Sequence, residues 1–322
     1  MNKTLLHPLR LRRESRSFTD ALYGVLESKG WFTLPKYMLA GMTGACFRFS
    51  VHRELHPDSA TAYNWMAEHF VACDLIGITT SQWGGFHFTP TFPLYQEQAV
   101  LDIKRAIDSG TGAVVWKDGF VIVNGYNEQS QVFYYLDGLT ESAQELPFAG
   151  FGLNVSPYAY YQIYETQIET DLLQIIKESC IQAVFRAETP DVMLPEEDYA
   201  CGLAAYDAIL EALQSGRFHA DGAYETFLVY ASAKKDAAAY TQHAVSYWPS
   251  LQEVAAQYSR LSLIYEKILE TKFMQNPLPS TPVDDLTGLF RAAGEAETAA
   301  VRAIRGLLRE PIANRFHDIG LR

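Results

Sequence analysis

The pattern of apolar residues changes near Glu169, and this change constrains the fold more than any other feature of the sequence. Before Glu169, short apolar runs are interspersed with amphipathic segments, which predicts a mixture of strands and helices. After Glu169, long segments rich in Ala and Leu follow one another, which predicts helices alone. Because 322 residues exceed what one hydrophobic core usually serves, we predict an α+β domain over 1–168 and an all-helical domain, a helical bundle, over 169–322.

The strongest β signal is a hairpin in the first half. Residues 120–126 (FVIVNGY) are mostly apolar, residues 127–130 (NEQS) form a polar turn, and residues 132–136 (VFYYL) are apolar again. Two apolar runs separated by a short polar turn are typical of paired antiparallel strands. A further strand is predicted over 158–168, which is rich in Tyr and Ile.

Capping signals predict a first helix over 17–30. Ser17 is a suitable N-cap, Asp20 follows in the position of a capping box, and Gly30 is a suitable end. Two more helices are predicted over 59–77, beginning at Ser59, and over 95–110.

Two segments between these helices lack a clear helical pattern. Residues 38–52 are apolar and punctuated by Gly, which indicates a loop and a strand, and residues 80–95 are predicted to be an aromatic loop. In the second half, helices are predicted over 170–185, 195–216, 223–248, 250–273 and 282–310, with residues 274–285 as the most linker-like segment.

Composition and charge exclude several classes of function. The formal net charge of −12 argues against a nucleic acid or an anionic membrane as the partner. No apolar run approaches ~18 residues, so no membrane span is expected. The 4 cysteines lie far apart without a CxxC motif, which favours a reducing cytoplasm. The sequence has no phosphate-binding or dinucleotide-binding motif, so we expect no cofactor. A homodimer is compatible with the sequence.

Three short motifs occur in the order found in a known family. They are SFTDAL at 17–22 with Gly30 after it, LAGMTGACFRF at 39–49, and GFVIVNGYN at 119–127 followed by YYLDG at 134–138. Together they resemble the papain-like cysteine peptidases, and most closely the family of the N-terminal domain of butirosin biosynthesis protein H. The resemblance covers about residues 15–138. It implies a papain-like first domain in which the helix beginning at Ser17 packs against the hairpin at 120–136.

The catalytic positions of that family are substituted in this chain. Its cysteine corresponds to Ser17, its histidine to Asp118 or Gly119, and its orienting residue to Asp137. A serine hydroxyl needs a base far more than a thiol does. We therefore expect Ser17 to serve as an N-cap and Asp137 as a turn residue bonded to the backbone near Gly138.

Other residues remain candidates for a site. Cys46 is an alternative nucleophile, which makes the catalytic candidates Ser17, Cys46, Asp118 and Asp137. The residues expected to line a ligand cleft are Gln82, Trp83, His87, Gly119 and Tyr126.

Three hypotheses for function follow. The first is a non-catalytic or catalytically altered cysteine-peptidase-like protein that binds a peptide-like, acyl or small-molecule ligand, as an accessory protein in natural-product biosynthesis. The alternative is an acyl or aminoacyl transferase acting on a carrier-protein thioester, similar to butirosin biosynthesis protein H. The third is a zinc site formed by His52, His56, His69 and Cys73, but Pro57 disfavours a helix through the first pair, so we expect no metal.

Overall fold

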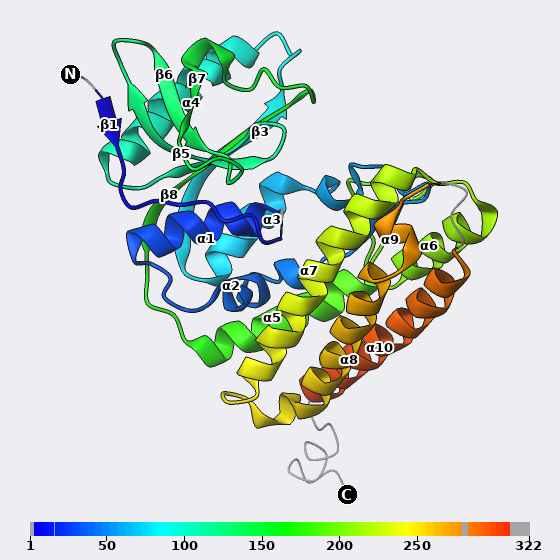
Figure 1. The fold of residues 1–322 in the computed structure, drawn as a ribbon. Coiled ribbons are helices and arrows are strands. Elements are labelled where there is room, and N and C mark those ends of the chain that lie inside the picture. Colours follow the sequence, from blue (N-terminus) through cyan, green and yellow to red (C-terminus); the bar gives the residue numbers. More distant parts are fainter. Residues whose placement is uncertain (1–2, 16, 279–282, 310–322) are drawn as a thin grey trace, which may run out of the picture.

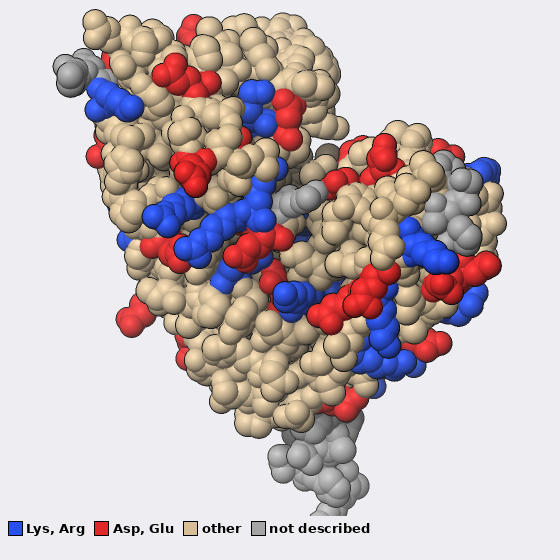
Figure 2. All heavy atoms as spheres, in the orientation of Figure 1, with Lys and Arg blue, Asp and Glu red and all other residues tan. Residues whose placement is uncertain are grey.

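The protein has a mixed α+β fold with an antiparallel sheet at one end and a helical region at the other (Figure 1). The computed structural model describes residues 3–15, 17–278 and 283–309. Figure 2 shows acidic and basic side chains interspersed on the described part of one face, including several adjoining Lys and Arg side chains with acidic side chains beside them. Within the described ranges, no helix combines the length and the apolar character needed to cross a membrane.

The main sheet is antiparallel throughout. Its strand order is β3-β8-β4-β5-β6-β7, and β1 pairs with β5 beside this path. The strands are β1 (Lys3–Leu5), β3 (Ile78–Phe86), β4 (Ala113–Trp116), β5 (Phe120–Asn127), β6 (Val132–Leu136), β7 (Gln144–Pro147) and β8 (Tyr158–Gln167). The predicted hairpin is confirmed as β5 and β6, and the predicted Tyr-rich strand is confirmed as β8.

The prediction of a loop over 80–95 was wrong. The first part of this segment belongs to β3, and the rest leads into α4 (Phe92–Asp108). Strand β3 lies at the edge of the sheet, where it pairs with β8. An edge strand can be largely polar, because it is less buried than a central one. In the sequence, Gly84 and Gly85 suggested a loop, but in the structure both residues are paired with β8.

The first helix, α1 (Phe18–Lys29), is confirmed together with both of its predicted ends. Ser17 accepts the backbone N–H of Thr19, and Gly30 ends the helix in the left-handed region, with φ of 73°. The helix packs against β5, as the resemblance implied. The rings of Phe18 and Phe120 meet edge to face with centroids 5.4 Å apart.

The segment 38–52 was expected to be a loop and a strand, but much of it is helical. It contains α2 (Lys36–Met42), the short 3-10 helix η1 (Ala45–Phe47) and β2 (Ser50–His52). The glycine at position 41 allows close helix packing, because a Cβ there would lie only 2.0 Å from the ring of Tyr240. The next helix, α3 (Trp65–Leu75), is capped by Asn64, whereas Ser59 begins only the 3-10 helix η2 (Ser59–Thr61).

The second half is largely helical, as predicted, but it is not all-helical, because a short strand lies within it. Its helices are α5 (Leu172–Glu188), α6 (Ala204–Ser215), α7 (Ala220–Ala244), η4 (Pro249–Leu251), α8 (Gln252–Leu269), α9 (Lys272–Gln275) and α10 (Asp284–Leu308). The expected helix start at Pro195 was wrong, because α6 begins at Ala204. The residues before it form β9 (Tyr199–Cys201), which pairs with β2.

One hydrophobic core extends across the predicted boundary near residue 168. Strand β8 ends at Gln167 and α5 begins at Leu172, but α2 packs against both α5 and α7. Buried residues of α1 and α2 thus share a core with the helical half. Part of the predicted linker at 274–285, residues 279–282, lies outside the described residues.

Candidate functional site

The N-terminus of α1 is the position at which the resemblance places a nucleophile. The hydroxyl of Ser17 accepts the N–H of Thr19 at 3.3 Å and shares a 2.7 Å hydrogen bond with the hydroxyl of Ser15. Ser15 in turn donates to the carboxylate of Asp20 at 2.7 Å. A chain of two hydroxyls therefore connects Ser17 to a buried carboxylate.

Asp20 is the centre of a capping network. Its carboxylate accepts the backbone N–H of Glu14 at 3.0 Å and of Ser15 at 2.8 Å, and lies 3.4 Å from the ammonium of Lys36. Lys36 also lies 3.1 Å from Asp236. Burial would lower the pKa of Lys36, but the carboxylates of Asp236 and Asp20 outweigh it and raise the pKa. The network holds the chain before α1 in place.

The expected histidine position is occupied by a turn between β4 and β5. Asp118 has φ of 53°, and its carboxylate accepts the N–H groups of Val155 at 2.9 Å and Ser156 at 3.3 Å. A Cβ at Gly119 would lie 3.2 Å from the guanidinium of Arg13. Asp118 thus anchors the loop before β8, and Arg13 fills the space beside Gly119.

Asp137 closes the turn after β6, as predicted. It accepts the N–H of Leu139 at 2.8 Å and of Thr140 at 3.1 Å. Burial alone would raise the pKa of Asp137, but these hydrogen bonds outweigh it and lower the pKa below its usual value. The backbone oxygen of Asp137 also accepts a 2.6 Å bond from Arg13.

Cys46 lies in the core and is only 2% exposed. Burial raises the pKa of its thiol well above the usual range, so the thiol is protonated at neutral pH. Cys46 and Ser17 line the same small cavity of about 30 Å³, together with Arg48 and Asp236. This volume is sufficient for a water molecule or two but not for a substrate.

The five residues expected to line a cleft are not brought together. Gln82 donates to the backbone oxygen of Met66 at 2.5 Å, on the side of the sheet that carries α3. Trp83 stacks on Tyr95 of α4, with ring centroids 4.8 Å apart. His87 follows the end of β3, Gly119 is in the β4–β5 turn, and Tyr126 bonds to Asp108 at 2.8 Å.

His69 is buried beside the first turn of α1. Its ring stacks on Phe18 with centroids 3.5 Å apart, and its two nitrogens each lie 2.9 Å from a tyrosine hydroxyl, of Tyr63 and Tyr160. Burial, and then the charges of Arg48 and Arg186, lower the pKa of His69 well below its usual value. The imidazole is therefore neutral and takes part in the packing of α3.

The proposed zinc ligands are separated in the structure. The rings of His52 and His56 are 4.7 Å apart, and His219 lies 4.0 Å from His56, whereas His69 and Cys73 lie in the core. In the described part of the chain, no three His, Cys, Asp or Glu residues are arranged to hold a metal ion.

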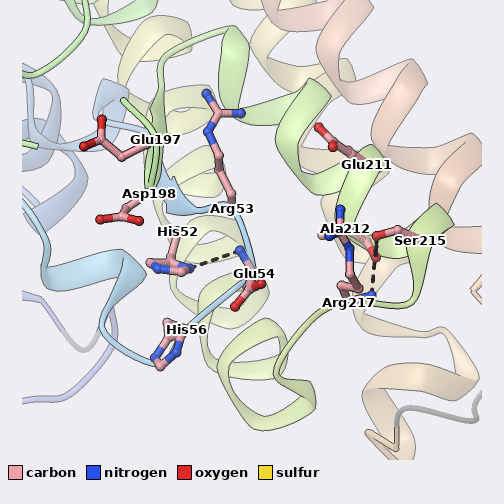
Figure 3. Close-up of a pocket in the computed structure, with 10 residues that line it drawn as sticks. All are labelled: His52, Arg53, Glu54, His56, Glu197, Asp198, Glu211, Ala212, Ser215 and Arg217. Carbon is pink, nitrogen blue, oxygen red and sulfur yellow. Dashed lines mark hydrogen bonds between the residues drawn. The ribbon is translucent and has the colours of Figure 1, made fainter. Parts of the chain in front are cut away.

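A polar hollow of about 380 Å³ lies beside His52 and His56 (Figure 3). Its walls come from β2 and the loop after it, the loop before β9, and α6 with the turn that follows. Its charged side chains, including Arg53, Glu197 and Glu211, belong to residues exposed to solvent. Charges of both signs in open solvent are typical of an ordinary surface.

A second pocket contains a more unusual arrangement of charge. The Nη1 atoms of Arg48 and Arg186 donate to the same carboxylate oxygen of Glu68, at 3.0 and 2.7 Å. Burial would raise the pKa of Glu68, but the two guanidinium groups outweigh it and lower the pKa. The Arg48 guanidinium also lies over the ring of Tyr63, 3.5 Å from its centroid.

We call this cavity the Arg48 pocket. It has a volume of about 220 Å³ and lies between β2, α3, α5 and the loop before β9. Its lining residues are Arg48, Phe49, Ser50, Tyr63, Asn64, Ala67, Glu68, Phe185, Arg186, Thr189, Pro190, Asp191, Val192 and Cys201. Sequence reasoning missed it. The available signal was an arginine next to phenylalanine. Arg48 lies between Phe47 and Phe49 in CFRFS, and Arg186 follows Phe185 in VFRAE.

No protein-family model matches the chain, and no curated protein matches its sequence. The capped N-terminus of α1 and the Arg48 pocket lie next to each other, since Arg48 lines both the pocket and the small cavity beside Ser17.

Proposed function

We propose that the protein is a non-catalytic, cysteine-peptidase-like protein that binds a peptide-like, acyl or small-molecule ligand in the Arg48 pocket. One observation carries the proposal. The polar catalytic candidates Ser17, Asp118 and Asp137 bond to neighbouring groups of the chain. The Arg48 pocket instead combines apolar walls with arginine nitrogens that lack partners in the described residues.

The packing of α1 supports the scaffold part of the proposal. A capped helix lies against a hairpin, with Ser17 at the helix start and Phe18 in contact with Phe120. The positions that would supply a base hold Asp118, directed to the loop before β8, and Gly119. A base must lie within hydrogen-bond reach of the nucleophile. The four unpaired cysteines suit a reducing compartment, and we propose the cytoplasm.

The position of the Arg48 pocket supports the binding part. The residues Arg48, Tyr63 and Glu68 come from the first half of the chain, and Arg186 and Cys201 from the helical half. Small-molecule sites occur preferentially where two units of structure meet, with mostly apolar walls and a few polar groups that orient the ligand.

A second candidate function has one observation in its favour. The hydroxyl chain from Ser17 through Ser15 to Asp20 could move a proton from Ser17 to the carboxylate while the Ser17 oxygen attacks the carbonyl carbon of a carrier-protein thioester. The acyl C–S bond then breaks, the acyl group stays on Ser17, and the carrier thiolate leaves with the proton returned from Asp20. The same carboxylate already accepts two backbone N–H groups, which makes the chain a capping structure first.

Cys201 provides a test of binding, because it lines the pocket and is partly exposed while the other three cysteines are buried. The rate at which N-ethylmaleimide alkylates Cys201 would be followed by peptide mass spectrometry with and without 1-hexanol or hexanoate. We expect at least one probe to slow this alkylation by fivefold or more, and not to slow that of a Cys201→Ser variant carrying a surface cysteine elsewhere.

The proposal fails if neither probe protects Cys201. It also fails if the protein hydrolyses an acyl thioester and Ser17→Ala abolishes that activity, which would establish the second candidate instead.

A further inference from the structure

The two arginines that line the Arg48 pocket have more hydrogen-bond donors than the described residues supply acceptors for. A guanidinium carries five N–H donors and no acceptor. Arg48 and Arg186 share one oxygen of Glu68, and the Nε atoms of both arginines are buried without a partner among the described residues. Buried polar groups are nearly always paired, so this pair of guanidiniums is suited to an additional acceptor.

The charge around these two arginines is also unbalanced. Two guanidinium groups face one carboxylate, that of Glu68, and the adjacent His69 has a lowered pKa and is neutral. The other acidic residue of the pocket is Asp191, whose carboxylate accepts the N–H of Met193. Asp191 belongs to the loop between α5 and β9, where the next residue, Val192, is 92% exposed. The Arg186 side chain is only 11% exposed, so the two arginines are more buried than this loop.

The rest of the pocket is suited to an apolar group. Phe49, Phe185, Pro190 and Val192 line the pocket together with the arginines and contribute apolar surface to it. A volume of about 220 Å³ is below the ~300–1,000 Å³ typical of larger ligand pockets. A short chain of a few carbons is therefore the size of ligand that the space admits.

Carboxylate matches these features better than phosphate does. A guanidinium presents a planar pair of donors that fits a carboxylate with two parallel hydrogen bonds. The excess of one positive charge is neutralised by one carboxylate, whereas a phosphate monoester carries about −1.5 to −2 at neutral pH and would exceed it.

We propose that the Arg48 pocket selects an organic carboxylate with a short apolar chain, and that Arg48 and Arg186 are its anion receptor. The inference rests on the proposed binding function and names the ligand class for that site. Arg48 and Arg186 hold the carboxylate, the aromatic and aliphatic walls cover the chain, and Glu68 keeps the two guanidiniums together in the absence of ligand.

The test compares three probes of the same length: hexanoate, 1-hexanol and hexylamine. Each would be titrated while the alkylation of Cys201 by N-ethylmaleimide is measured in the full-length protein. We expect hexanoate to protect Cys201 at concentrations at least tenfold lower than 1-hexanol, and hexylamine to protect least. Equal protection by hexanoate and 1-hexanol overturns the carboxylate inference and leaves the binding function in place.

Variants identify the receptor. Arg186→Gln should weaken protection by hexanoate at least tenfold and leave protection by 1-hexanol within twofold, which also shows that the pocket remains folded. Arg53→Gln, an exposed arginine just after β2 and outside this pocket, is the matched control and should change neither. Glu68→Gln removes the competing carboxylate and should strengthen binding of hexanoate severalfold.

The outcomes separate the two proposals. If Arg186→Gln and Arg48→Gln both bind hexanoate as the parent does, the receptor assignment is wrong even if the pocket binds carboxylates. If neither hexanoate nor 1-hexanol protects Cys201, the binding function and the carboxylate inference both fail.

Discussion

The N-terminus of α1 and the Arg48 pocket are neighbours that differ in how completely their polar groups are hydrogen-bonded. Arg48 lines both the small cavity beside Ser17 and the larger pocket. At the helix terminus, Ser15, Ser17 and Asp20 are bonded to one another and to backbone N–H groups. In the pocket, Arg48 and Arg186 share a single carboxylate and leave buried nitrogens without partners in the described chain.

Complete hydrogen bonding is expected of a polar cluster that stabilises the fold, and incomplete hydrogen bonding is expected of one that binds a ligand. A satisfied network stabilises the fold, because breaking any bond leaves a buried group unpaired. An incompletely satisfied cluster in a pocket can be completed by a ligand. The polar side chains at the N-terminus of α1 thus belong to the first kind, and the proposed ligand site belongs to the second.

The largest expected effect is on stability at the helix terminus. Asp20→Ala removes the acceptor of Ser15 and Glu14 and one of the carboxylates around Lys36. Breaking a buried ion pair by removing one partner costs about 3–5 kcal/mol of unfolding free energy. Urea unfolding followed by circular dichroism would measure it, with Asp20→Asn as the isosteric control. A loss below about 1 kcal/mol would show that the network is not structural.

The second effect is a loss of stability in mild acid. Burial lowers the pKa of both His69 and His52 in the folded protein, and the adjacent His56 lowers that of His52 further. The unfolded state, with a histidine pKa near ~6.5, binds protons that the folded state does not. This stability is therefore full above pH ~6.5 and is lost as the pH falls below it.

Between pH 7.5 and pH 5 we expect a loss of roughly 2 kcal/mol, because a buried histidine that stays neutral costs ~1.4 kcal/mol for every pH unit below ~6.5. Urea midpoints at several pH values would measure this loss, with His7→Gln, a change of an exposed histidine, as the control. A flat profile down to pH 5 would mean that the buried histidine does not resist protonation.

A smaller effect tests the role of Ser17 directly. Ser17→Ala removes the hydroxyl that accepts the N–H of Thr19 and should cost about 1 kcal/mol, whereas Ser17→Gly should cost only a few tenths. Thermal and urea unfolding of both variants would give this ratio. Equal stabilities for Ser17→Ala and the parent would contradict the capping role of Ser17 and favour the alternative in which its hydroxyl is a nucleophile.

The smallest expected effect concerns catalysis. Ser17→Cys combined with Gly119→His restores the residue types of the resembled family, but we expect no thioester hydrolysis above that of Ser17→Ala. The reason is the guanidinium of Arg13, which lies 3.2 Å from where the new Cβ would be and is held by a bond to Asp137. A clear gain of thioester hydrolysis in the double variant would show that only these two side chains were missing. Adding Arg13→Ala to the double variant tests whether the Arg13 guanidinium blocks the new histidine.

Part of the fold and little of the site were predictable. Ser17, Gly30 and the β5–β6 hairpin follow from short-range rules, since capping and turn formation depend on residues only a few positions apart. The edge strand β3 and the helix α2 were not predicted, because their residues are shaped by neighbours distant in the chain: β8 for the strand and Tyr240 for Gly41.

The sequence by itself determined the α+β first half, the helical second half and the local ends of α1. Only the tertiary structure decided the Arg48 pocket. Arg186 lies 118 positions from Glu68, and Arg48 lies 20 positions from it, so no periodicity connects them. They meet because α2 and η1 pack against α5 and because β2 pairs with β9. Charge pairing across such distances depends on how the whole core closes, which local patterns do not encode.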